Sequence, residues 1–87
     1  QSQPLPRPVQ VAVLEEGGVL VQHRGLPDRD RHRVERLAGG GVVVAPHPQL
    51  PAPVVATAWR HRLECRSVDL EGLEAFIARH RGRGPDR

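Results

Sequence analysis

The chain has 87 residues and a formal net charge of +3; 38% of its residues are hydrophobic and only 2% are aromatic. From this length we expect a single domain with a modest core built mainly from Val, Leu and Ala. All thirteen basic residues are Arg, and they alternate with acids in stretches such as 28–31, which disfavours nucleic acid as a partner.

A single Cys excludes an internal disulfide framework. The longest apolar run falls far short of the ~20 residues that a bilayer-crossing helix needs, so we expect no membrane span and no signal peptide. Because a core this small is marginally stable by itself, we expect a protein partner or a homo-oligomer.

The N-terminal part of the chain predicts an arm followed by a hairpin. Residues 1–8 carry three prolines and indicate an extended, polyproline-like arm. Val occupies alternate positions in 9–16, and a second β-rich run covers 19–24. Because Gly17 and Gly18 between them suit a tight turn, the two runs predict a β-hairpin.

A helix and a buried strand are expected next. Asp28 or Asp30 can cap a helix over 29–38, and the glycines at 39–41 end it. The continuous apolar run 42–45 then indicates a strand that is covered on both faces.

The last third predicts a hairpin and a helix. Four prolines make 46–53 a rigid connector, after which 54–60 reads as a strand and 61–65 as its returning partner. Asp69 caps the final helix and Gly82 ends it. The buried face of this helix consists of Leu70, Leu73, Phe76 and Ile77.

The predicted order is hairpin, helix, strand, hairpin, helix, which makes an α+β fold with a small mixed sheet and two helices. Strand 19–24, helix 29–38 and strand 42–45 would form a right-handed parallel crossover. The βαβ–ββα order resembles a thioredoxin-like domain in topology, but without a Cys-x-x-Cys it implies no redox activity. One domain over 9–82 is expected, with a tail at 83–87.

The five His residues are candidate metal ligands, although none has the dense spacing of a His-x-x-x-His site. His23 shares strand parity with Val19 and Val21, so it either packs at the end of an apolar face or serves as a ligand. His47 lies between two prolines, which either form a stiff structural turn or hold the imidazole in place for a function.

Paired carboxylates, such as Glu15 and Glu16, can act as acid and base or bind a hard cation. On the predicted strand these neighbours point to opposite faces and do not converge. Solvated charges at a turn are therefore the simpler interpretation.

Cys65 needs a nearby His to act as a nucleophile. His61 would lie about 13 Å away along an extended strand, whereas His23 or His47 on another strand is left open. A buried, inert thiol is the simpler alternative. Trp59 is most simply the largest anchor of the core.

Several segments in the same order resemble domain-of-unknown-function family 3105 (DUF3105). The sequence Thr57-Ala58-Trp59, followed by Leu-Glu-Cys ending at Cys65, carries most of this resemblance. The resembling segments are 14–23, 45–53, 57–65, 68–70, 76–77 and 83–85.

The resemblance implies a cellular location and shows that this chain lacks part of the family's sequence pattern. The family is common in actinobacteria and its members often follow an N-terminal membrane anchor, which implies an extracytoplasmic or cell-surface protein; a cytoplasmic one is the alternative. The family pattern His-x-x-Glu-His-Gly corresponds to 12–17, where only Glu15 and Gly17 match. An upstream segment with a His and a Tyr is missing, so we expect a degenerate or N-terminally truncated member with a weakened case for catalysis.

The leading hypothesis is a non-catalytic binding or interaction domain without a cofactor. It would act through a β edge or the connector around His47, with Trp59 and Cys65 as further interaction candidates. The alternative is a metal-binding or enzymatic domain in which Glu15, His23 and His47 hold a divalent transition metal, with Cys65 as a soft ligand. A basic nucleic-acid module is the third and least favoured hypothesis.

Overall fold

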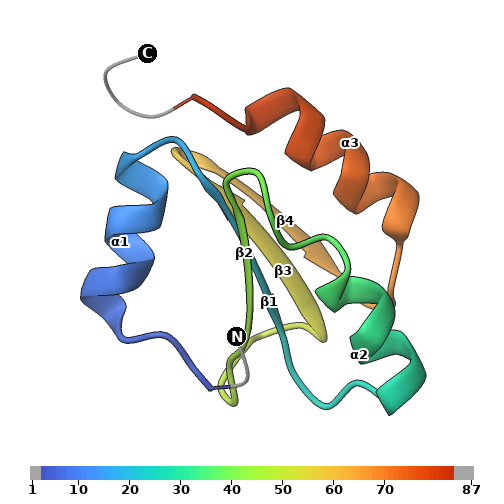
Figure 1. The fold of residues 1–87 in the computed structure, drawn as a ribbon. Coiled ribbons are helices and arrows are strands. Elements are labelled where there is room, and N and C mark those ends of the chain that lie inside the picture. The colour runs from blue at the N-terminus through green and yellow to red at the C-terminus, as the bar shows by residue number, and fades with distance from the viewer. Residues whose placement is uncertain (1–2, 84–87) are drawn as a thin grey trace.

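The computed structural model describes residues 3–83, which form a four-stranded sheet with helices on both faces (Figure 1). The predicted α+β class is confirmed, with three helices in this range instead of two. In chain order the elements are α1 (Arg7–Glu15), β1 (Val19–His23), α2 (Asp28–Glu35), β2 (Val42–Pro46), β3 (Val54–Ala58), β4 (His61–Cys65) and α3 (Leu70–His80).

The strand order in the sheet is β2-β1-β3-β4. Strands β1 and β2 run parallel, as predicted for the crossover through α2. Strand β3 runs antiparallel to both of its neighbours, β1 and β4, so the predicted hairpin of the last third is confirmed. The βαβ–ββα order is therefore present, with α1 added before it.

The hairpin predicted around Gly17 and Gly18 is wrong, because 9–16 is not a strand. Helix α1 begins at Arg7, within the predicted arm, and accommodates Pro8 in its first turn, where proline is tolerated. Its partly buried side chains are Gln10, Val13 and Leu14, which have helical spacing. The alternating Val residues therefore imitated the pattern of a strand. In the helix, two of these three Val residues are exposed.

Three predicted elements end earlier than expected, and β1 does so by one residue, at His23. Helix α2 ends at Glu35, and the amide of Leu37 donates to the carbonyl of Val34 in a tighter turn. Strand β3 ends at Ala58, because the two residues after it form the turn to β4 and Arg60 adopts a left-handed φ of 67°.

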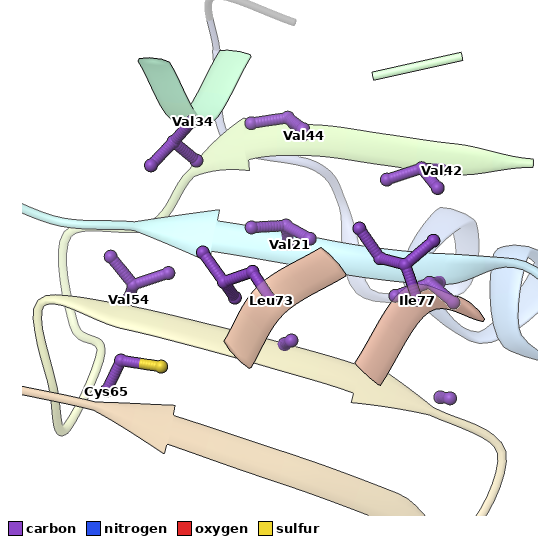
Figure 2. Packing of buried hydrophobic residues seen from close by; sticks show 11 residues of the cluster. Val21, Val34, Val42, Val44, Val54, Cys65, Leu73 and Ile77 are labelled. Carbon is purple, nitrogen blue, oxygen red and sulfur yellow. The ribbon is translucent and has the colours of Figure 1, made fainter. Parts of the chain in front are cut away.

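The main core lies on the face of the sheet that α2 and α3 cover (Figure 2). It consists of Val19, Val21, Val34, Val42, Val44, Val54, Ala56, Ala58, Cys65, Leu73 and Ile77. A smaller cluster lies on the opposite face, where Leu50 and Ala52 from the connector pack with Val55 of the sheet. Val55 faces this side because it points away from its neighbour Val54. Trp59 belongs to neither cluster and is only partly buried, so its predicted role as the core anchor is wrong.

None of the helices within residues 3–83 combines the length and the apolar character that crossing a bilayer requires.

Candidate functional site

The carboxyl ends of the parallel strands β1 and β2 lie side by side, because His23 and Pro46 are register partners. After β1 the chain continues into α2, which packs on the face of the main core. After β2 it continues into the connector, where Leu50 packs on the opposite face. Loops that diverge in this way leave a crevice at the carboxyl ends of parallel strands, the usual place for a ligand in such sheets.

A groove of about 560 Å³ occupies this crevice. Its apolar walls come from the N-terminal segment, the loop before α2 and the end of β2, and are formed by Pro4, Leu26, Pro46 and Pro48. Its polar side chains are His23, Arg24, Arg31 and His47. The combination of apolar walls and a few polar groups is typical of a binding site.

His23 lines the groove and is only 5% exposed. It follows Val19 and Val21 on the core face, as its strand parity predicted. Its Nε2 atom is buried and has no hydrogen-bond partner among the described residues. Burial lowers the pKa of the imidazole, Glu35 partly opposes this shift and Arg31 adds to it. His23 therefore presents a neutral ring with an unused nitrogen.

Arg31 on α2 also lines the groove and has a buried nitrogen without a partner. One terminal nitrogen, Nη2, lies 3.4 Å from the Oδ1 atom of Asp28. The Nε atom is buried and finds no acceptor within the described part of the chain. Because an Arg nitrogen can only donate, this atom lacks an acceptor such as an oxygen.

His47 lines this groove and also a neighbouring hollow beside α1. Its backbone N–H donates to the carbonyl of His23 at 2.9 Å, which ties the two residues together. Its Nδ1 accepts from the N–H of Gln49 at 3.1 Å, so a neutral ring carries its proton on Nε2. The structure thus shows a turn that holds the imidazole in place, and a function for His47 stays a prediction.

Glu15 does not join His23 and His47. It is exposed at the end of α1, four residues before β1 begins at Val19, and β1 carries the chain about 13 Å from Val19 to His23. Its neighbour Glu16 is exposed as well. Contrary to the prediction, neither residue is on a strand. In the range 3–83 no group of three or more His, Cys, Asp and Glu side chains is placed to hold a metal ion.

Cys65 lies in the same cross-sheet row as His23, but Val54 separates them. Two strand spacings place their backbones about 10 Å apart, beyond hydrogen-bond reach. Burial raises the pKa of the Cys65 thiol, and the nearby carboxylate of Asp69 adds to this rise. The thiol is therefore protonated at neutral pH, which agrees with an inert, buried Cys.

Trp59 lies at the other end of β3, in the turn after Ala58. Together with Leu14, Arg60 and Arg62 it lines a separate hollow of about 360 Å³. The candidate residues predicted for interaction therefore occupy three places, and only His47 belongs to the groove.

Arg31 and Leu26 were not identified as site residues from the sequence. Arg31 lies in a run of alternating charges that is typical of a solvated helix face. The available signal was its place one turn into the helix that follows a parallel strand, where α/β proteins bind ligands.

The family model described as "Protein of unknown function (DUF3105)" matches residues 2–87. No curated protein and no solved structure matches the chain. Since the family match covers nearly the whole sequence, the chain belongs to the DUF3105 family.

Proposed function

We propose that this chain is a non-catalytic binding domain of an extracytoplasmic protein, and that the groove receives an extended segment of a partner protein. One observation carries the proposal: a groove with apolar walls is lined by His23 and Arg31, each of which has a buried nitrogen without a partner in the described chain. Leaving such a group unpaired costs about 1–3 kcal/mol, and a rearrangement of either side chain that lets a bound ligand pair with it would recover this cost.

The shape of the groove favours an extended chain. Strand β2 is an edge strand, and its last residue, Pro46, lines the groove. A peptide that leaves the groove along β2 meets backbone groups that no further strand of the sheet occupies. The proline and leucine walls give its side chains apolar contacts.

The chemistry of the groove favours binding over catalysis. Its polar side chains are two Arg and two His, and none of them is a strong nucleophile. Cys65, the candidate nucleophile, is separated from His23 by Val54. The extracytoplasmic location is supported by the resemblance to anchored family members.

A peptide-display selection against the whole chain tests the proposal. Selected peptides should bind at least tenfold more weakly to Pro48→Trp, because the indole fills the groove. Pro51→Trp is the matched control, since Pro51 is exposed on the same connector and does not line the groove. The proposal is contradicted if no peptides are selected. It is also contradicted if the selected peptides bind Pro48→Trp as tightly as they bind Pro51→Trp. Sedimentation of the chain alone shows whether the partner is a second copy.

A divalent transition-metal site is the second candidate function, because His23 and His47 line the same groove. Imidazole nitrogens suit Zn(II) and Cu(II). Titration with each metal should give micromolar or tighter binding that is lost in both His23→Ala and His47→Ala. Binding that survives in either variant contradicts a site built from this pair.

A further inference from the structure

We propose that the outer edge of β4 pairs with β4 of a second copy of this chain, antiparallel about a two-fold axis at Leu63. Strand β4 is the last strand of the sheet, and no other strand within residues 3–83 lies beyond it. It lies at the opposite edge of the sheet from β2, so the inference goes beyond the groove and its proposed ligand.

The backbone of β4 presents hydrogen-bonding groups to this open edge at two residues. Strands β3 and β4 are joined by a two-residue turn at 59–60, so Ala58 and His61 form the hydrogen-bonded pair next to the turn. Along an antiparallel ladder, hydrogen-bonded pairs alternate with pairs that are not hydrogen-bonded. The N–H and C=O groups of Arg62 and Glu64 therefore point away from β3.

A two-fold axis at Leu63 uses both of these residues. It places Arg62 opposite Glu64 of the second copy, and Glu64 opposite Arg62 of the second copy. Because both residues direct their backbone groups outward, each of these pairs is a hydrogen-bonded one, with Cα atoms about 5.5 Å apart. This register therefore satisfies the outward backbone groups in the middle of both strands.

The side-chain charges of β4 fit the same register. The Nη2 atom of Arg62 lies 2.8 Å from the Oε2 atom of Glu64, and the two side chains are 51% and 50% exposed. Pairing adds an opposite charge of the second copy beside each of them and keeps the ion pair within each copy. Opposite charges on directly opposed residues stabilise antiparallel strands, whereas like charges destabilise them. Extension beyond β4 would place Arg60 opposite Arg66 of the second copy, so the charges also limit the pairing to this strand.

On the other face of β4, Leu63 supplies an apolar contact at the axis. Leu63 packs against the main core and lines a hollow of about 260 Å³ between β4 and α3, together with Ala75 and Phe76. The two Leu63 side chains would form the central pair without hydrogen bonds, in which the Cα atoms are about 4.5 Å apart and the side chains are closer. The hollow of each copy then borders the interface, so pairing also removes apolar surface from water.

Sedimentation equilibrium of the whole chain tests the pairing. The mean mass should rise from one chain toward two with a Kd between about 1 μM and 1 mM, as expected of a small interface. Glu64→Arg places Arg opposite Arg in both pairs and should weaken the dimer at least tenfold. Glu74→Arg is the matched control, because it makes the same charge change on an exposed residue of α3 that does not line the hollow. The control should leave the Kd unchanged.

The charge swap Arg62→Glu/Glu64→Arg separates cross-strand pairing from a general effect of charge. It reverses both members of each pair, so that Glu again opposes Arg, and it should restore most of the affinity that Glu64→Arg loses. If Glu64→Arg fails to fold, hydrogen exchange on the unchanged chain still decides the question. The outward amides of Arg62 and Glu64 should become more protected as the protein concentration rises, while the amide of Leu63, which already faces β3, should change far less.

Each outcome either supports the pairing or overturns it. A chain that stays monomeric up to about 1 mM would overturn it. So would a dimer that Glu64→Arg leaves intact, or a folded charge swap that does not restore the dimer. A dimer that Pro48→Trp abolishes would place the contact at the groove, which would overturn the pairing of β4 and support the proposed binding function with a second copy as the partner.

Discussion

Gly18 shows how closely the loops at one end of the sheet approach each other. A Cβ atom at this position would lie 2.8 Å from Cγ1 of Val13 and 2.9 Å from the carbonyl oxygen of Gly41. Because one of these contacts is with backbone, a side-chain rotation cannot relieve it. We expect Gly18→Ala to lower the free energy of unfolding by about 1–3 kcal/mol, as overpacking does. Urea denaturation measures this loss.

Gly82→Asn is the control for this steric effect. Gly82 has a φ of 83°, and a Cβ atom there would meet no atom within 4 Å. Asn tolerates this left-handed conformation after a helix, so its cost should be well below that of Gly18→Ala. Equal losses in the two variants would contradict close packing at Gly18.

His23 and Arg31 show how much of the candidate site the sequence could indicate. The parity of His23 with Val21 correctly predicted its face of the sheet, because strand alternation is a local property. Arg31 was missed, because burial of one nitrogen in a charged helix depends on the loops packed around it. Glu15 ends helix α1 and does not line the groove with His23, because 9–16 folds as a helix instead of the expected strand.

Helices α1 and α3 differ in how firmly they are attached to the sheet. Helix α1 contains no buried side chain in the described chain, and Val9 and Val11 are each 43% exposed. Helix α3 buries Leu73 and Ile77 in the main core. We therefore expect the free energy of local opening to be at least about 2 kcal/mol lower for α1 than for α3. This difference corresponds to the burial of about one aliphatic side chain.

Native-state hydrogen exchange tests this difference between the helices. Amides in the middle of α1 should exchange by local opening, while those around Leu73 should follow global unfolding. Equal protection of both helices would show that α1 is as firmly held as α3.

Asp69 fixes the beginning of α3 by a side-chain cap. Its Oδ1 accepts from the N–H of Gly72 at 3.0 Å, as its position before the helix predicted. Asp69→Ala should lower the free energy of unfolding by about 0.5–2 kcal/mol, while Asp69→Asn should retain most of the stability. Thermal unfolding of both variants checks this. An Asn variant as unstable as the Ala variant would contradict the cap.

Helix α3 was predicted correctly and α1 was not, because local sequence signals agree in α3 and conflict with the fold in α1. Helix α3 has a cap, an apolar stripe and a terminating Gly82, so local signals agree. In α1 the alternating Val residues favour a strand, yet both neighbours of β1 are already β2 and β3. The sheet therefore has no place beside β1 for 9–16, and this is a property of the whole fold that no local pattern contains.

Across the whole molecule, two His residues on different elements link stability to pH. Burial lowers the pKa of His23 at the groove. Burial also lowers the pKa of His80, as do the stacked ring of His61 at 4.1 Å and the charges of Arg79 and Arg83. Both shifts mean that the folded protein binds protons less readily than the unfolded chain, whose His residues titrate near 6.5.

Well above pH 6.5 these imidazoles are neutral in both states, and their contribution to stability is fully present. As the pH falls through 6.5, the unfolded chain takes up protons first, so the free energy of unfolding decreases until the folded-state pKa values are passed. Thermal unfolding between pH 7.5 and 5 should therefore show a falling Tm. In His23→Gln/His80→Gln the fall should be much smaller, whereas His32→Gln, which removes an exposed imidazole from α2, should retain it. A Tm of the unchanged protein that stays constant or rises on acidification would contradict the linkage. If the Tm of the double variant falls with pH as steeply as that of the unchanged protein, the pH dependence belongs to other groups.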